Sequence, residues 1–251
     1  MQPILTAHLF APLHYELMAL LRRIRDEEWN APTAAGSWTV KDLTAHLLDT
    51  ALRRLSQVPI PQFEPNAANR DWIVAMQRVS PRILVELMDR YGAEQAAYLA
   101  SLDPFATAMW GVTWAGEDQS PVWFDVAREL TERWHHQQQI RDALARPALF
   151  DPYLRPVIDT FVRGVPHAYR EFSADNETAI ALRITDAWTL RRSSGQWNLS
   201  AGEDADASAV VTIDPDSAWR LFTKGQAKNE PRLEGDRRLA EPLLKMICVI
   251  G

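Results

Sequence analysis

The sequence predicts a protein in two parts, an N-terminal four-helix bundle followed by a small α+β domain. In roughly the first 150 residues, apolar side chains recur at three- and four-residue spacing in four long segments, which is typical of amphipathic helices. Connections rich in proline and glycine separate these segments. After about residue 175 the pattern changes to short stretches of alternating side chains followed by helical segments. We therefore place the domains at 1–150 and 151–251.

The first two predicted helices cover residues 5–28 and a segment that begins near Thr39. Regularly spaced leucines form the apolar stripe of the first helix, and the segment 30–37 interrupts it. Thr39 is a candidate N-cap of the second helix, with Asp42 as the acidic partner of a capping box. The prolines at 59 and 61 are expected to end this helix, because proline cannot continue the backbone hydrogen bonds.

The third and fourth predicted helices cover about 70–101 and 122–145. The stretch 103–120 between them contains two glycines and two tryptophans and is expected to be an irregular connection. Four helices with two longer connections favour a bundle.

The second half is expected to contain a small sheet and several helices. A helix at 152–171 could belong to either domain, Asp214 and Pro215 begin another helix, and a last helix covers about 237–248. The predicted strands are Thr178–Thr185, Trp188–Arg192, Gln196–Leu199 and Ala209–Asp214.

Composition excludes several classes of protein. The chain has 251 residues, of which 47% are apolar and 24% charged, and a net charge of −6. Neither half is basic, so we expect no nucleic-acid partner and no binding to an anionic membrane surface. The longest apolar runs are shorter than the roughly 20 residues that cross a bilayer. No secretory signal is visible, and a cytoplasmic protein is expected.

The chain has one cysteine and six histidines. One cysteine excludes an internal disulfide and a cysteine-rich zinc site, so a metal site would need histidines and carboxylates. Cys248 follows Met246 and Ile247 in an apolar segment, where a thiol is typically a small buried hydrophobe rather than a nucleophile.

Glu132 and His136 form the first candidate site. They are four residues apart on the fourth predicted helix, so they lie on one face and could share a divalent metal. His46, on the second predicted helix, is the candidate third ligand, and three protein ligands would leave a position open for water or substrate.

A simpler reading of the same spacing is a solvated helix face. On the fourth helix the apolar side chains point one way, while Glu132 and His136 point nearly opposite. A site inside the bundle core is therefore doubtful, and the polar face would have to look into a cleft. His135 is expected at the surface, with a supporting or alternative ligand role as the other possibility.

Other candidates are less specific. Three tryptophans could line a pocket mouth, namely Trp38, Trp110 and Trp114, and three further histidines have no predicted role, namely His8, His14 and His167. The sequence lacks the glycine-rich loops of nucleotide-binding proteins and the G-x-S-x-G elbow of serine hydrolases.

Two motifs around the candidate ligands resemble a known family. They are Ser37-Trp-Thr-Val-Lys-Asp-Leu-Thr-Ala-His46 and Glu132-Arg-Trp-His-His136-Gln-Gln-Gln-Ile-Arg141. Together they resemble the mycothiol-dependent maleylpyruvate isomerase family, part of the wider DinB-like group of metalloproteins. The segment 209–250 resembles the second domain of that family, which is similar to sterol carrier proteins.

The resemblance implies a DinB-like four-helix bundle in 1–150 and a sterol-carrier-like α+β domain in 151–251. It implies one divalent metal, typically zinc, held by His46, Glu132 and His136. It also implies a low-molecular-weight thiol such as mycothiol as cofactor, and an isomerase or S-transferase that acts on a small electrophilic or unsaturated acid. Arg141 projects about 140° away from His136 and is a weak candidate for binding an anionic substrate.

Two alternatives stay open. One is a non-catalytic protein that binds a small molecule or lipid in its C-terminal domain. The other is a metal-activated hydrolase, which would use the same ligands but bound water as its nucleophile.

Overall fold

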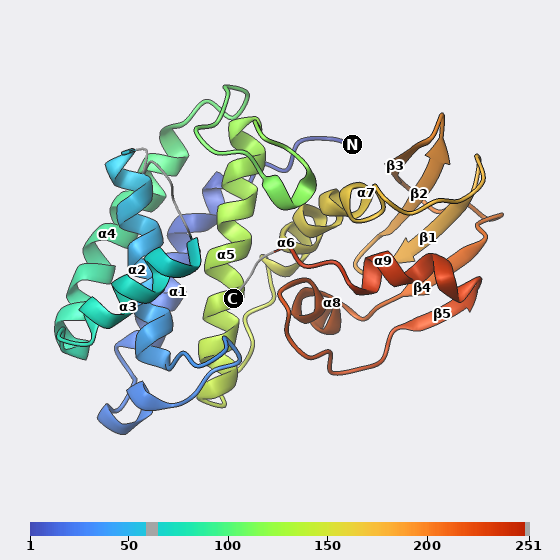
Figure 1. Ribbon diagram of the computed structural model, residues 1–251. Coiled ribbons are helices and arrows are strands. Elements are labelled where there is room, and N and C mark those ends of the chain that lie inside the picture. The colour runs from blue at the N-terminus through green and yellow to red at the C-terminus, as the bar shows by residue number, and fades with distance from the viewer. Residues whose placement is uncertain (59–64, 249–251) are drawn as a thin grey trace. The chain divides into compact units, whose positions relative to one another are not determined.

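The computed structural model describes residues 1–58 and 65–248 and contains two compact units (Figure 1). We call them the helical unit, which comprises Thr6–Asp103 and Glu132–Leu149, and the sheet unit, which comprises Met1–Leu5, Pro104–Thr131 and Phe150–Gly251. The predicted fold class is confirmed, since a helical N-terminal region precedes a mixed α+β region. The domain limits 1–150 and 151–251 stay a prediction.

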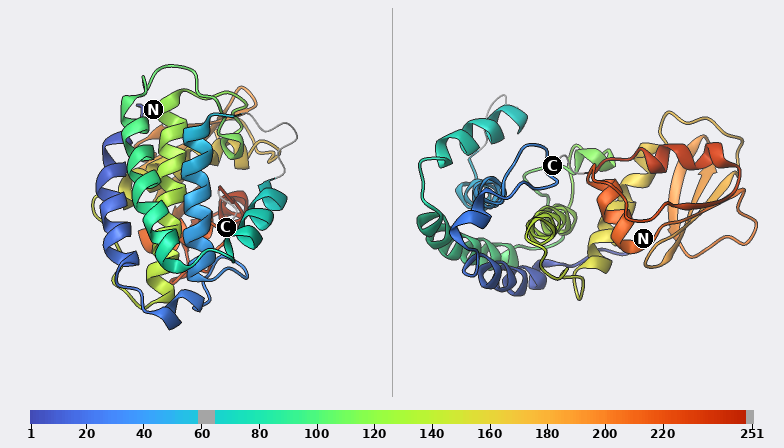
Figure 2. Two further views of the ribbon diagram at one scale, coloured as in Figure 1. Left: turned by 90° about the vertical axis from the view of Figure 1, so that its left-hand side faces the viewer. Right: turned by 90° about the horizontal axis from the view of Figure 1, so that it is seen from below.

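Long helices make up the helical unit (Figure 2, left). Helix α4 packs against both α1 and α2, and α3 packs against α2. None of the helices within 1–58 and 65–248 combines the length and the apolar character needed to span a bilayer. The helices of this unit are α1 (Phe10–Leu21), α2 (Val40–Ser56), α3 (Pro65–Met76), α4 (Pro81–Ser101) and residues 132–143 of α5 (Val122–Ala143).

Helix α2, which carries His46, begins at the predicted cap. The Thr39 hydroxyl accepts a hydrogen bond from the Asp42 backbone N–H, and the Asp42 carboxylate accepts one from the Thr39 backbone N–H at 2.9 Å. This reciprocal pair satisfies two backbone donors and fixes the start of the helix. The helix ends at Ser56, followed by Gln57 in the left-handed conformation. The prolines predicted to end it, at 59 and 61, lie outside the described residues.

The single helix predicted at 70–101 is wrong, because the structure has two helices there, α3 and α4. Ser80 caps α4 by accepting a hydrogen bond from the backbone N–H of Ile83, and Pro81 occupies the first turn. Ser followed by Pro is an ordinary helix start, because proline has no N–H to satisfy at that position. The continuous apolar spacing concealed this boundary.

Three other predicted helices are shorter or divided. The segment 5–28 contains α1 flanked by short 3-10 turns at Ala7–Leu9 and Asp26–Asn30. The segment 152–171 contains α6 (Leu154–Phe161), a 3-10 turn and α7 (Val165–Ala168). At 237–248 a 3-10 turn precedes α9 (Glu241–Leu244). Pro166 and Pro242 lie within these divided segments and limit continuous helix.

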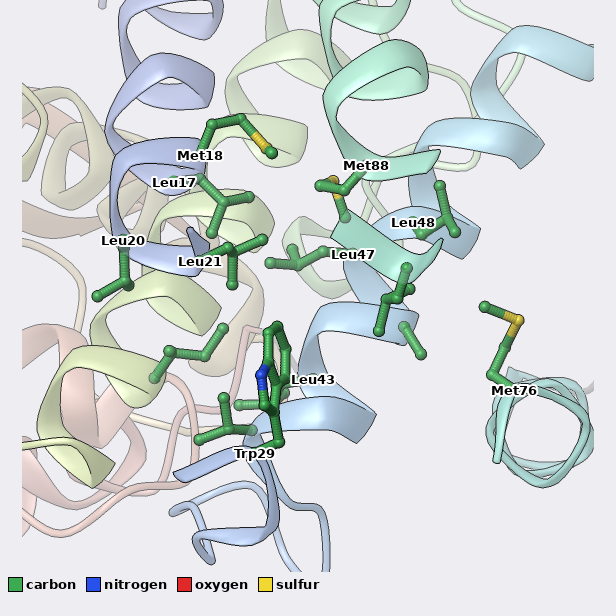
Figure 3. Packing of buried hydrophobic residues seen from close by; sticks show 14 of the residues in the cluster. Leu17, Met18, Leu20, Leu21, Trp29, Leu43, Leu47, Leu48, Met76 and Met88 are labelled. Atoms are coloured by element: carbon green, nitrogen blue, oxygen red, sulfur yellow. The ribbon is translucent and has the colours of Figure 1, made fainter. Parts of the chain in front are cut away.

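The core of the helical unit is a contiguous apolar cluster between the helices (Figure 3). Leu21 of α1 points toward Leu47 of α2, and Trp29 lies beside Leu43 (Figure 3). These four side chains are nearly inaccessible to solvent. The close packing holds α2 in place, and with it the side chains on the rest of its circumference.

The sheet unit contains a five-stranded mixed sheet in the order β3-β2-β1-β4-β5 (Figure 1). Strand β1 pairs antiparallel with β2 and parallel with β4, and the other pairs are antiparallel. Strand β5 was not predicted, because its charged sequence at this sheet edge lacks an apolar face. The strands are β1 (Ala179–Arg183), β2 (Ala187–Ser193), β3 (Gln196–Ala201), β4 (Ala209–Thr212) and β5 (Arg232–Gly235).

Aromatic side chains join the helices and strands of the sheet unit. Phe161 of α6 meets Phe222 of α8 (Pro215–Phe222) with ring centroids 5.9 Å apart. Tyr169 lies against Trp197 of β3 at 5.1 Å. Asp214 caps α8 by accepting from the Ser217 N–H, with Pro215 in the first turn, as predicted.

Candidate metal centre

The structure brings together the three predicted ligands, His46 of α2 and Glu132 and His136 of α5. Oε1 of Glu132 lies 2.9 Å from Nε2 of His46 and 3.2 Å from Nε2 of His136. One ligand atom from each residue falls within 4.8 Å of the others. The two imidazoles meet edge to face, with centroids 4.9 Å apart. All three side chains belong to the helical unit, so one packed region determines their geometry.

The cluster is buried, which the helical wheel did not predict. His46 is 4% exposed and His136 fully buried, while the Glu132 side chain is 12% exposed. Apolar residues of α5 such as Leu130 and Trp134 are also fully buried. Side chains are therefore buried around most of the helix, and the polar face is not a solvated one. Polar side chains can be buried in this way where they find hydrogen-bond partners in the interior.

Gln139 sets the hydrogen-bonding state of His136. Its Oε1 lies 2.7 Å from Nδ1 of His136, one turn along α5. An amide oxygen can only accept, so Nδ1 carries the proton and donates. Nε2 is then the nitrogen that faces Glu132, and a metal bound there would take the place of the Nε2 proton. Sequence reasoning assigned no role to Gln139, although a His-x-x-Gln spacing on a helix is a readable signal for such a pair.

His46 is held by packing as well as by Glu132. The indole of Trp38 lies 5.0 Å from the His46 ring and 6.5 Å from the His136 ring, measured between centroids. Of the three tryptophans proposed for a pocket mouth, Trp38 lies at this cluster. Burial lowers the pKa of His46, although the Glu132 carboxylate opposes the shift. The neutral imidazole, which is the form that binds metals, is therefore favoured.

Glu132 is the anionic member of the cluster. Burial alone would raise the pKa of its carboxyl, but the charge and hydrogen bond of His136, together with the hydrogen bond of His46, hold the pKa well below its usual range. Glu132 is thus ionised near neutral pH. One carboxylate and two imidazole nitrogens face one another in this cluster.

This donor set fits a divalent cation. Two neutral nitrogen donors and one carboxylate oxygen form the ligand combination of open catalytic zinc sites, and the second nitrogen of one imidazole is already oriented by an amide. Nδ1 of His46 is buried without a hydrogen-bond partner among the described residues, and Nε2 is the nitrogen that faces the cluster. His46, Glu132 and His136 therefore fit a divalent metal, and their assignment as metal ligands stays a prediction.

The other candidate residues lie elsewhere or differ from expectation. His135 is fully buried, so the expected surface position is wrong. Arg141 donates to the Pro147 carbonyl, and its Nη2 lies 3.5 Å from Oε2 of Glu16. The guanidinium is thus engaged by residues outside the cluster. Trp114 packs against Phe124 in the sheet unit. His8 is exposed, Trp110 is half-buried, His14 is buried on α1, and His167 lies beside Gly116 in the sheet unit.

Fold and cluster together define a class of protein, a helical bundle with a His–Glu–His group on two helices and a mixed sheet later in the chain. A family model described as the mycothiol maleylpyruvate isomerase N-terminal domain matches residues 10–141. The chain therefore belongs to the mycothiol maleylpyruvate isomerase family, as its motifs predicted.

The fold is also similar to two solved structures. A crystal structure of the mycothiol-dependent maleylpyruvate isomerase has 13% sequence identity and a TM-score of 0.59, over 93% of this chain and 96% of that chain. The structure of a histidine-to-alanine mutant of mycothiol-dependent maleylpyruvate isomerase has 13% identity and a TM-score of 0.54, over 88% and 91%. At this identity the likeness shows the fold alone. No curated protein matched.

Proposed function

We propose that this protein is a metal-dependent enzyme that uses a low-molecular-weight thiol, such as mycothiol, to isomerise or S-conjugate a small electrophilic or unsaturated acid. His46, Glu132 and His136 would hold one divalent metal, with zinc as the first candidate. The observation that supports this most directly is the convergence of the three ligand atoms within 4.8 Å in a buried setting. Membership of the mycothiol maleylpyruvate isomerase family supports the thiol and the substrate class.

The chain's own residues prepare the site. Gln139 fixes the ring of His136 so that Nε2 faces the cluster, and the ionised Glu132 supplies one negative charge between the two imidazoles. Trp38 packs beside His46. A divalent metal, when bound, stabilises the anionic form of a thiol and so makes a nucleophile available at neutral pH.

The proposed isomerisation conserves the thiol. A thiol bound beside the cluster would supply a sulfur that adds reversibly to one carbon of a cis double bond, with the electron pair of that bond moving into the conjugated carbonyl. Rotation about the resulting single bond and loss of the same sulfur would give the trans isomer, so that no atom is gained or lost. In the S-transferase version the carbon–sulfur bond would be kept. The neighbouring carbon would then take up a proton, or a leaving group would depart from the attacked carbon with its electron pair.

Metal analysis tests the ligands. Full-length protein purified without chelators is expected to contain about one zinc or other divalent ion per chain, and His46→Ala and Glu132→Gln should lose it. His8→Ala, a histidine outside the cluster, serves as the matched control and should keep the metal. Equal metal content in wild type and both cluster variants would contradict the proposal.

A thiol-dependence assay tests the reaction. Metal-loaded protein is mixed with a cis-unsaturated keto acid such as maleylpyruvate, with and without mycothiol, and the absorbance of the conjugated acid is followed. Turnover that requires both the thiol and an intact His46 supports the proposal. Thiol-independent hydrolysis of a substrate would instead support the metal-activated hydrolase, and ligand binding without turnover would support a carrier.

A further inference from the structure

A cavity lies within the sheet unit, and the residues that line it are not used by the metal cluster. Its volume is about 310 Å³, at the lower end of the range for small-molecule sites. Trp123 and Phe124 from the first turn of α5 and Trp197 from β3 form its aromatic wall. Arg163 and Glu117 supply the charged side chains of the described lining. The size suits a ligand with a single ring system.

The aromatic wall is held in place by contacts of its own. The rings of Trp123 and Phe124 are stacked, with centroids 5.2 Å apart. Nε1 of Trp197 donates to the Phe172 carbonyl at 2.9 Å, which fixes the indole and satisfies its only donor. A wall fixed in this way needs little reordering to bind a ring, so the entropic cost of binding is small.

Arg163 is a half-buried cation without an ion-pair partner among the described residues. Its guanidinium lies over the Trp123 ring, 5.6 Å from the centroid, and donates to the Gln2 carbonyl. Its Nε is buried and has no hydrogen-bond partner there. Burial lowers the pKa of Arg163, but an arginine remains protonated near neutral pH. A desolvated cation of this kind favours an anionic partner.

Glu117 lines the same cavity and carries the opposite charge. Its carboxylate accepts a hydrogen bond from the Ser120 hydroxyl at 2.6 Å. Arg163 is attracted from a distance by Asp159 and, more weakly, by Glu117, but neither carboxylate lies within 4.0 Å of the guanidinium. Arg163 and Glu117 thus place a positive and a negative charge beside the same aromatic wall without forming an ion pair with each other. This arrangement is complementary to a ligand that carries both charges and a ring.

We propose that this cavity binds a small aromatic zwitterion of the α-amino acid class. The carboxylate lies beside Arg163, the ammonium beside Glu117, and the ring against the wall of Trp123, Phe124 and Trp197. The proposal is independent of the metal cluster, because none of these residues belongs to the helical unit.

Calorimetric titration of the full chain with three matched probes tests it. L-phenylalanine carries both charges, 3-phenylpropanoate lacks the ammonium, and 2-phenylethylamine lacks the carboxylate. We expect L-phenylalanine to bind at least about tenfold more tightly than either single-charge probe, because each lost probe charge leaves a cavity charge without its partner. His46→Ala should bind all three as wild type does.

Two variants and one control complete the test. Arg163→Gln should abolish the preference over 2-phenylethylamine, and Glu117→Gln the preference over 3-phenylpropanoate, whereas Arg170→Gln, at an exposed arginine of the same segment, should change neither. Equal affinity for the three probes, no saturable binding, or unchanged binding in Arg163→Gln would overturn the proposal. If Arg163→Gln does not fold, the comparison of the three probes on wild type decides alone.

Discussion

At the scale of single residues, the cluster depends on a side chain that is not a predicted ligand. Gln139 accepts a hydrogen bond from Nδ1 of His136 and thereby leaves Nε2 as the nitrogen that faces Glu132. The sequence contains three consecutive glutamines at 137–139, and the three-residue spacing places Gln139 on the same helix face as His136. The spacing does not show that the Gln139 side chain adopts the rotamer that reaches Nδ1.

Replacing Gln139 should weaken metal binding without unfolding the protein. Gln139→Ala removes the acceptor that orients His136, and loss of such a partner typically costs about 10- to 100-fold in metal affinity. Competition for zinc against a chromogenic chelator measures this loss. Gln119→Ala, at an exposed glutamine, is the control. An affinity equal to wild type would show that Gln139 does not position the ligand.

His14 should make the stability of the fold depend on pH. Burial, with the charge of Arg133 acting in the same direction, lowers the pKa of His14, which is 8% exposed and faces the Asp89 carbonyl at 3.2 Å. The unfolded chain therefore binds this proton more readily. The contribution of neutral His14 is fully present above the unfolded pKa of about 6.5 and is lost as the pH falls below it.

Urea unfolding at pH 7.5 and 5.5 checks this prediction on wild type and His14→Gln. On acidification, wild type should lose more free energy of unfolding than His14→Gln, by at most about 1.4 kcal/mol per pH unit for one proton. Other titrating groups, His46 included, largely cancel in this difference. A difference independent of pH would show that His14 has the same pKa in both states.

At the scale of elements, the caps account for what could and could not be predicted. The start of α2 was readable because Thr39 and Asp42 stand between a loop and an apolar stripe. The division between α3 and α4 has an equally ordinary signal in Ser80 and Pro81, but the apolar spacing continued across it. Strand β5 offered no pattern at all, since its pairing with β4 comes from tertiary structure.

The cap of α2 can be tested on its own. Thr39→Ala removes the hydroxyl that accepts from the Asp42 N–H, and we expect a loss of about 1 kcal/mol in the free energy of unfolding. Thr39→Ser keeps the hydroxyl and should restore most of it. Denaturant titration of the three proteins measures the effect. If serine and alanine lose the same amount, the methyl group rather than the cap matters.

At the scale of the whole molecule, the predicted ligands join segments that are far apart in the sequence. His46 and Glu132 are separated by 86 positions, so an unfolded chain does not present them together. The motifs predicted the three residues, but their burial followed from α5 having buried side chains around most of its circumference, which a helical wheel cannot show.

Removal of metal should therefore lower the thermal stability of wild type. A ligand that binds only the folded state stabilises it by about 2.7 kcal/mol when present at 100 times its dissociation constant. Scanning calorimetry with zinc and after treatment with EDTA should show a higher unfolding temperature with zinc. Glu132→Gln should show little difference between the two conditions. An equal zinc effect in wild type and variant would place the binding elsewhere.

The order of the strands also has a consequence for how the sheet assembles. Strands β1, β2 and β3 follow one another through short turns, so they can pair early, whereas β4 reaches the free edge of β1 only in a parallel crossover. Strand β1 ends up with neighbours on both sides. Its amides should consequently be among the slowest in the sheet to exchange hydrogen for deuterium, and those of the edge strands β3 and β5 among the fastest.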